Sequence, residues 1–442
     1  MTAAPSPAPR PPGLEADVLV VGGGMAGALA ALAARASGAR VALVRRSPGA
    51  TALSSGAISV APHRPAHPNE PLAGRRGPLE SARALAAASP DHPYAVLGVD
   101  ALGDALAFAS HALDPLLAPA LDRPRVLPTA FGSAASAALC QRSMEAGDLL
   151  AVRGTLAVAG LAGHLAFDAG LVAAGLERYA ARGGPPARAI ALELPGLVSP
   201  TARPHELARA LEAPGAAEAL GGALRAALPA SAGAALLPPV LGLDPGARVA
   251  ERAAAAAGLP VAETLSDVPS VPGLRLQRAI DGALRDAGVV CVTAGIGAGW
   301  VFPGEPVDAG GTPVTARAWV LATGRFVGGG IARRGVLAEP ALRLAVQAAE
   351  GREAGVHLAV RPAASLTVRD RRDHQPLLSA GLRVDAALRP LDERGGVVHP
   401  RLLAAGAVLG GHEQATDGTG LGVAILTGFL AGLTAAGEGT RG

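Results

Sequence analysis

The sequence contains no lysine, few aromatic residues and only two cysteines. All 39 basic residues are therefore arginine, and they are scattered without a basic run interleaved with aromatic residues. With a net charge of only +3, this distribution gives no indication of nucleic-acid binding. Cys140 and Cys291 lie far apart in apolar surroundings, so we expect neither a disulfide framework nor a metal site. Two cysteines are also too few to hold an iron–sulfur cluster on this chain alone.

The sequence also lacks a long hydrophobic run. The segment that comes nearest, GLGVAILTGFLAGLTAAG at residues 420–437, carries five glycines and two threonines, and it predicts a buried helix rather than a transmembrane one. The N-terminus, MTAAPSPAPRPPG, is rich in proline and has no apolar segment of the kind found in signal peptides. We therefore expect a disordered tail over residues 1–14 and a cytoplasmic protein.

What the sequence does contain is a strand–turn–helix–strand pattern over residues 17–46, DVLVVGGGMAGALAALAARASGARVALVRR. The apolar runs Val18–Val21 and Val41–Val44 predict two parallel strands, and the alanine-rich segment between them predicts a helix. The turn before the helix reads G-x-G-x-x-G, which is typical of dinucleotide or flavin binding. The alternative is a unit that keeps this fold and binds nothing.

Each glycine of the motif has an expected task. Gly22 makes the tight turn, Gly24 allows close approach of a phosphate, and Gly27 packs the helix against the strand. Met25 and Ala26 lie between them, at the positive end of the helix, where backbone N–H groups are expected to face the phosphate.

Two later segments make this interpretation more specific. ARAWVLATGRFVGGG, residues 316–330, predicts a strand that ends in A-T-G, and LLAAGAVLGGHEQATDGTGLGVAI, residues 402–425, predicts a strand, a glycine loop and a helix start. An N-terminal glycine unit, an A-T-G strand and a C-terminal A-x-G strand occur in this order in flavoproteins of the glutathione-reductase architecture. The predicted fold class is therefore α/β, a Rossmann-like FAD/NAD(P)-binding domain of glutathione-reductase type with an inserted α/β cap lobe.

The inserted lobe is expected where strand-like runs alternate with helical stretches. Its strands are predicted from GTLAVAG, AIALEL and AALLPPVLGL. The expected organisation is a tail over residues 1–14, a first flavin-binding segment over 15–75, the cap lobe over 76–274 and a second flavin-binding segment over 275–442.

Taken together, these segments resemble the B subunit family of anaerobic glycerol-3-phosphate dehydrogenase. The resemblance covers nearly the whole chain beyond the tail. It includes SSGAISV at residues 54–60, HPYAVLG at 92–98, LAGHLAFDAGLVAAGL at 161–176, VPSVPGLRLQRAI, LATGRFVGGG and LRPLDERGG…LLAAGAVLGG. HPYAVLG and VPSVPGLRL are specific, because no general rule of flavoprotein structure requires them.

The resemblance implies a complex. In that family the B subunit is assigned FMN and pairs with an FAD-bearing A subunit, and an iron–sulfur C subunit docks the pair to the cytoplasmic membrane. Together they oxidise sn-glycerol 3-phosphate to dihydroxyacetone phosphate and pass the electrons to quinone. For this chain the resemblance implies FMN, with FAD as the alternative. The expected cofactor contacts are Gly22, Gly24, Met25, Ala26, Gly27, Arg45, Arg46, Ser54, Ser55, Gly56, Thr323, Gly324, Gly406, Ala407, Gly418 and Gly420.

Two positions depart from a usual FAD site. The second strand ends on Arg45 and Arg46, where an acidic residue normally holds the adenosine ribose. FMN lacks adenosine and would need no acid there; alternatively, Arg45 could pair with the 2′-phosphate of NADP, or both arginines could be solvated surface charges. Ala407 stands where the related fumarate-reductase pattern A-A-G-E has a carboxylate, so tight binding of FAD is in doubt.

The expected catalytic residue is His412, the histidine next to the predicted flavin loop, because removal of a hydride from an alcohol needs a base. If the A subunit performs the chemistry, this chain needs no base. Two other functions stay open. One is a flavin-free structural subunit that stabilises its FAD-bearing partner, and the other is a free-standing oxidoreductase similar to fumarate reductase.

Overall fold

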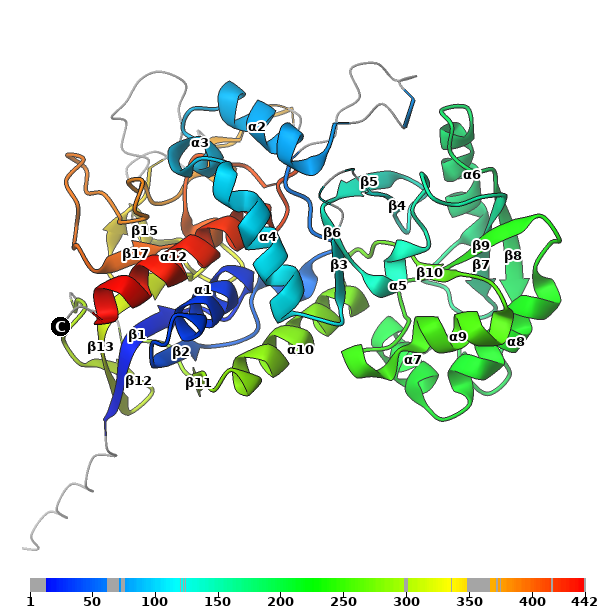
Figure 1. The fold of residues 1–442 in the computed structure, drawn as a ribbon, viewed down its shortest axis with the longest axis horizontal. Helices are drawn as coiled ribbons and strands as arrows, with labels where there is room; N and C mark the ends of the chain where they lie inside the picture. Colours follow the sequence, from blue (N-terminus) through cyan, green and yellow to red (C-terminus); the bar gives the residue numbers. More distant parts are fainter. Residues whose placement is uncertain are drawn as a thin grey trace, which may run out of the picture.

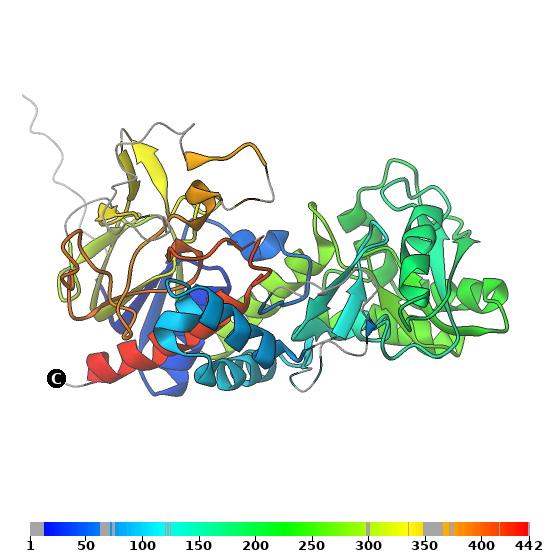
Figure 2. The ribbon, with the colours of Figure 1, turned by 90° about the horizontal axis from the view of Figure 1, so that it is seen from above.

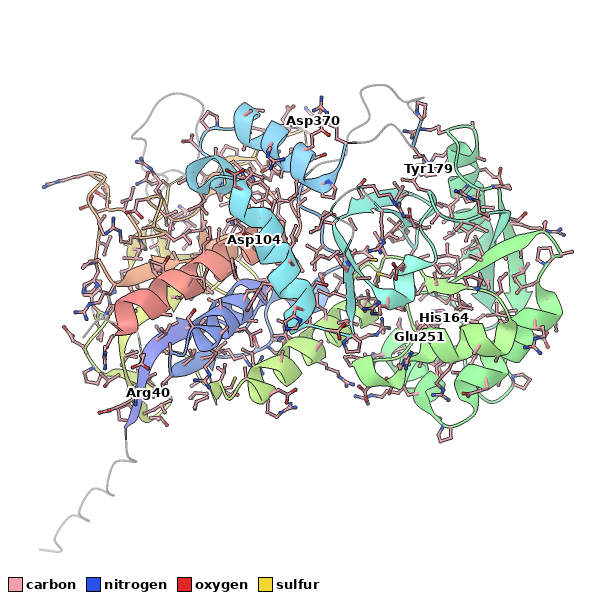
Figure 3. The ribbon with its side chains drawn as sticks, in the orientation of Figure 1. Arg40, Asp104, His164, Tyr179, Glu251 and Asp370 are labelled. Atoms are coloured by element: carbon pink, nitrogen blue, oxygen red, sulfur yellow. The ribbon has the colours of Figure 1, made fainter. Side chains whose placement is uncertain are left out.

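The computed structural model describes residues 13–61, 71–72, 76–119, 121, 123, 125–297, 301–334, 336–347, 366–370, 373, 375–414 and 416–440. The tail expected over residues 1–14 therefore lies almost wholly outside the described residues. Two lobes lie side by side in both ribbon views (Figures 1 and 2). Figure 3 shows their side chains, with Asp104 on a helix of the first lobe and Tyr179 on a helix of the second.

The first lobe is built on a largely parallel sheet in the order β11-β2-β1-β13-β12, and β17 pairs with β13. Because its central strands are covered on both faces, they read as continuous apolar runs. The strands are β1 (Leu14–Val21), β2 (Val41–Arg45), β11 (Val290–Thr293), β12 (Val307–Ala309), β13 (Thr312–Leu321) and β17 (Leu402–Ala404). A small sheet of β14 (Ala332–Arg334), β15 (Val336–Glu339) and β16 (Leu344–Ala345) belongs to the same half of the molecule, together with α11 (Pro376–Ser379).

The helix expected from the apolar segment near the C-terminus is α12 (Gly422–Thr440), and it packs along α1 (Met25–Ala36) (Figure 1). Glycines make this approach possible. A Cβ atom at Gly428 would lie 2.4 Å from the carbonyl oxygen of Ala26, and one at Gly432 would lie 2.3 Å from that of Ala30. The prediction of a buried helix is confirmed. Among the described residues, no helix is both long and apolar enough to cross a membrane.

The second lobe has a parallel sheet of its own, in the order β10-β9-β7-β8. The runs GTLAVAG, AIALEL and AALLPPVLGL supply β7 (Thr155–Leu161), β8 (Ala187–Leu192) and β9 (Ala232–Leu237), and β10 is Val261–Glu263. Helices α6 (Ala169–Ala180), α7 (Pro204–Glu212), α8 (Ala216–Ala227) and α9 (Val249–Ala257) complete this lobe, which has separate apolar clusters of its own. The prediction of a Rossmann-like domain with an inserted α/β lobe is confirmed.

Each segment between the two lobes can be assigned to one of them. Helices α2 (Pro78–Ala88), α3 (Pro93–Leu97) and α4 (Asp100–Ala112) lie on the first lobe, and Leu102 and Leu106 of α4 join its apolar core. Short strands and one short helix lead into the second lobe, and α10 (Val271–Asp286) returns from it. The elements that lead in are β3 (Leu117–Pro119), β4 (Arg125–Pro128), β5 (Ala134–Ala137), β6 (Leu139–Gln141) and α5 (Arg142–Glu145). The boundaries expected at residues 76 and 274 stay predictions.

Candidate flavin site

The site begins where four neighbouring strands end at one edge of the sheet. Val21 of β1 is in register with Val44 of β2 on one side and with Leu321 of β13 on the other, and Leu321 is in register with Ala404 of β17. The segments that follow these strands line one cavity of about 980 Å³, together with the start of α12. This volume is at the upper end of the range for small-molecule sites, and a cavity at this edge of an open parallel sheet is the usual place for a ligand.

Among the predicted cofactor contacts, this cavity brings together residues from four distant parts of the sequence. Those that line it are Gly22, Gly24, Met25, Ala26, Arg45, Arg46, Ser54, Thr323, Gly324, Ala407 and Gly420, and His412 lines it as well. Gly27, Ser55, Gly56, Gly406 and Gly418 do not line it. Gly27 and Gly406 instead allow close packing just behind the cavity, since a Cβ atom at Gly406 would lie 2.5 Å from the Cβ of Ala26.

Two glycines of the turn leave no room for a side chain, and a third, Gly24, does. A Cβ at Gly22 (φ +122°) would lie 2.1 Å from the carbonyl oxygen of Ala322, and one at Gly27 would lie 1.9 Å from the carbonyl oxygen of Gly22. At Gly24 the nearest atom to a Cβ would be Oγ1 of Thr51, at 3.4 Å. The protein itself therefore tolerates a side chain at Gly24, and the space beside it belongs to the cavity.

Thr51 is a contact that sequence reasoning missed. Its Oγ1 accepts a hydrogen bond of 2.9 Å from the backbone N–H of Met25, at the start of α1. The first N–H groups of a helix have no partner within the helix and favour negative charge. Thr51 therefore fixes the loop after β2 against the positive end of α1, and its segment, Gly49–Thr51, lines the cavity at that point.

The two arginines after β2 have different surroundings. Arg45 is only 18% exposed, and its guanidinium forms an ion pair of 2.5 Å with Asp281 of α10. The hydrogen bond to Asp281 raises the pKa of Arg45 above its ordinary value. Arg45 is therefore not a solvated surface charge. Arg46 is exposed and lies beside Gly295, and the part of the chain that the structure describes records no ion pair for it.

The cavity continues beyond these arginines. Its lining includes Ala294, Gly295, Ile296 and Gly297, the loop that follows β11. The cavity thus extends to both sides of the glycine turn, toward β2 and β11 on one side and toward β17 and α12 on the other. The sequence pointed to the first of these two arms only through Arg45 and Arg46, and the loop after β11 was not singled out.

In the arm of the cavity toward β17 and α12, an arginine lies next to Ala407. Arg325 follows the A-T-G of β13 directly, and it donates hydrogen bonds to the carbonyl oxygens of Ala407 (3.0 Å), Leu409 (2.8 Å) and His412 (3.2 Å). Burial lowers the pKa of Arg325 to about 10, so the group is still positively charged at neutral pH. A fixed positive charge therefore lies beside Ala407, the position at which the fumarate-reductase pattern A-A-G-E has a carboxylate. The position of Arg325 directly after A-T-G is a signal that sequence reasoning overlooked.

Two buried carboxyl groups also line the cavity. Glu339 has no exposed surface; it accepts hydrogen bonds from the N–H groups of Ala341 and Leu342, and burial raises its pKa. Glu413 is 4% exposed and accepts a hydrogen bond from the N–H of Gln375. Neither was predicted as a site residue. Glu339 has no recognisable motif around it, and in the glycine loop that holds Glu413 only the neighbouring His412 was singled out.

His412 is buried, with 3% of its surface exposed. Burial, aided by the positive charge of Arg325 and by His92, lowers its pKa well below the ordinary value of a histidine. The ring is therefore neutral at neutral pH. His92, to which sequence reasoning assigned no role, lies next to it with the ring centres 5.9 Å apart. The catalytic role expected for His412 stays a prediction.

These residues fit a flavin nucleotide. The open position at Gly24 and the start of α1 suit a phosphate group. Thr323 Oγ1 is buried without a hydrogen-bond partner among the described residues, as expected of a group that has a ligand to bind.

Comparison with known proteins agrees with this site. The model of the FAD binding domain family matches residues 17–423, which makes this protein a flavoprotein of the oxidoreductase class. A probable B subunit of anaerobic glycerol-3-phosphate dehydrogenase from Halobacterium salinarum is 33% identical, over 96% of this chain and 98% of that protein. The B subunit of the anaerobic glycerol-3-phosphate dehydrogenase of Yersinia pseudotuberculosis is 29% identical, over 93% of this chain and 96% of that protein. The chain belongs to the B subunit family of anaerobic glycerol-3-phosphate dehydrogenase, within the FAD binding domain family.

A solved structure, the open conformation of a flavocytochrome c3 fumarate reductase, is similar over 97% of this chain and 79% of that chain, with 10% sequence identity and a TM-score of 0.42.

The cofactor named in the description of the matching family is FAD. The expectation of FMN as the cofactor therefore finds no support, and the alternative, FAD, takes its place.

Proposed function

We propose that this chain is the FAD-holding B subunit of an anaerobic glycerol-3-phosphate dehydrogenase. In this complex, an FAD-bearing A subunit and an iron–sulfur C subunit are its partners. The complex oxidises sn-glycerol 3-phosphate to dihydroxyacetone phosphate and passes electrons to quinone, with the C subunit holding it at the cytoplasmic membrane. The proposal is supported by the family of the chain and by the cavity, which joins the glycine turn, the A-T-G strand and the start of α12.

The shape of the cavity favours FAD over FMN. FMN ends at its phosphate, which would lie at the start of α1. The arm toward β2 and β11, lined by Arg46 and by the loop from Ala294 to Gly297, would then have no occupant. In FAD the adenosine half continues from the diphosphate and would fill this arm. The ion pair with Asp281 leaves Arg46, and not Arg45, as the charged group available to it.

The other arm would hold the flavin ring. Flavin accepts a hydride or electrons from a bound substrate or partner. The protein would supply the positive charge of Arg325 and the start of α12 beside that ring, both of which favour the negative charge that a reduced flavin carries. This way of holding the flavin ring does not need an acidic side chain at the end of β2.

Activity should depend on the partners. We expect the isolated chain to show negligible oxidation of glycerol 3-phosphate with a soluble dye, because the FAD-bearing A subunit is proposed to oxidise the substrate. We also expect no quinone reduction, because two cysteines hold no cluster and give electrons no route to quinone. Dye reduction should appear when the FAD-bearing subunit is added, and quinone reduction only with the iron–sulfur subunit as well. Steady-state assays of each combination measure this. Turnover of glycerol 3-phosphate by the lone chain at about ten per second, an ordinary enzyme rate, would contradict the subunit assignment.

A further inference from the structure

The motif HPYAVLG brings a second histidine to the site. His92 is fully buried and precedes α3, where its Nδ1 accepts a hydrogen bond of 3.0 Å from the backbone N–H of Tyr94. Its ring lies against that of Tyr94, with ring centres 4.6 Å apart, and edge-on to that of His412. Two buried imidazoles from distant parts of the sequence therefore meet at the cavity wall.

The proton on His92 can be located from its hydrogen bond. Burial lowers the pKa of His92 to about 4, so the ring is neutral at neutral pH and carries one N–H and one lone pair. A backbone N–H can only donate, so the Nδ1 that faces Tyr94 must hold the lone pair. The proton of His92 is therefore on Nε2, and that atom is buried without a partner among the described residues.

The proton on His412 follows from its neighbour. Nδ1 of His412 is buried without a partner among the described residues. The neutral ring carries one N–H and one lone pair. If Nδ1 accepts from Nε2–H of His92, the proton of His412 is on its other ring nitrogen, Nε2.

The two unpartnered atoms are complementary. His92 offers a donor, Nε2–H, and the adjacent His412 offers an acceptor, Nδ1. A buried polar atom that lacks a hydrogen-bond partner destabilises the protein, so a small movement that joins the two atoms is favourable.

We propose that His92 is a positioning residue that donates to Nδ1 of His412, and that His412 serves as a neutral hydrogen-bond donor toward an oxygen atom of the bound ligand. The hydrogen bonds then all run one way, from the N–H of Tyr94 through His92 to Nε2–H of His412. His412 would donate to the ligand through Nε2–H, and it would not act as the base expected from the sequence. The acceptor is a flavin oxygen or a substrate oxygen, and in this respect the inference rests on the proposed function.

Long-range ¹⁵N–¹H NMR spectra of the ¹⁵N-histidine-labelled full chain test the proton positions, with His92→Gln and His412→Gln spectra to assign the signals. We expect both rings to be neutral with the proton on Nε2, with or without flavin. His92→Phe should leave His412 as a mixture of the two neutral forms, because the donor to Nδ1 is lost. His92→Gln should keep one form, because its amide can accept from Tyr94 and donate to His412. A proton on Nδ1 of His412 in the wild-type chain, or no effect of His92→Phe, would overturn the proposal.

The ligand is identified by titration of the same chain. A shift of the His412 Nε2–H signal on addition of FAD alone assigns the acceptor to the flavin. A shift only after further addition of dihydroxyacetone phosphate assigns it to the substrate. If neither shifts this signal while the flavin is bound, His412 is not a donor to the ligand. A chain that binds no flavin but has the expected proton positions contradicts the proposed function and leaves the positioning role of His92 intact.

Discussion

Gly24→Asp is expected to abolish flavin retention while the protein remains folded. Gly24 is the residue that precedes α1, and a Cβ atom there would meet no atom closer than 3.4 Å. Aspartate at this position can accept a hydrogen bond from the first turn and interacts well with the positive end of the helix, so the flavin-free protein should be as stable as wild type or more stable. The same charge repels the diphosphate of the cofactor.

The size of the effect follows from electrostatics. Two like charges about 4 Å apart near a protein surface repel by roughly 4 kcal/mol, which weakens binding about a thousandfold. Flavin content per folded chain, from the visible absorption of the purified protein, measures the loss, and circular dichroism measures the fold.

Two variants separate charge from shape and from folding. Gly24→Asn has nearly the same shape and caps the helix equally well, so it should retain more flavin than Gly24→Asp. Gly27→Ala should instead destabilise the fold itself, because its Cβ would lie 1.9 Å from the carbonyl oxygen of Gly22. A folded Gly24→Asp protein with full flavin content would show that the phosphate does not bind at this turn.

The second large effect is expected where α10 meets the inserted lobe. Arg275 of α10 and Glu263 of β10 form an ion pair of 2.5 Å with side chains that are 4% and 0% exposed. The guanidinium also donates to the side chain of Gln141 and to the carbonyl oxygen of Gly242. Removal of one partner leaves a buried charge without compensation, so Arg275→Met should lower the free energy of unfolding by about 3–5 kcal/mol.

The double variant Arg275→Met, Glu263→Leu is the matched control. It removes both charges and should recover much of the loss, because an apolar pair often replaces a buried ion pair at little cost. Urea denaturation followed by circular dichroism measures the wild type, Arg275→Met, Glu263→Leu and the double variant. If Arg275→Met is as stable as wild type, or if the double variant loses the sum of both single effects, the pair is not the compensated buried charge that we describe.

The parts of the site that were predicted from the sequence are those set by local backbone requirements. Gly22 and Gly27 can be recognised because a tight turn and a close helix contact leave no room for a Cβ atom, and the apolar runs around them identify the strands. The A-T-G strand and the start of α12 follow the same logic. Because the strands are parallel and in register, the segments that follow them meet at one edge of the sheet. The order of the motifs in the sequence predicts this arrangement.

Features of the site that depend on contacts between distant segments could not be predicted. Arg45 has the same type of charge as Arg46, and only the fold shows that Asp281 of α10 neutralises the first of them. In the same way, His92 gained no role from its own surroundings in the sequence, because its neighbour His412 arrives from the far end of the chain. One sequence holds no signal for such pairs.

The expectation of FMN fails to find support for a related reason. The absence of an acid at the end of β2 suggests that adenosine is absent, but the loop after β11 extends the cavity on that side. A missing side chain shows that one type of contact is absent, and it says nothing of the space that other segments enclose.

The most direct test of the account is the identity of the nucleotide that the purified chain carries. The protein should show the absorption bands of a flavin near neutral pH, and denaturation should release FAD, at one molecule per folded chain, as determined by chromatography and mass spectrometry. A folded, colourless chain that still binds its partner, or one that releases FMN, would contradict it.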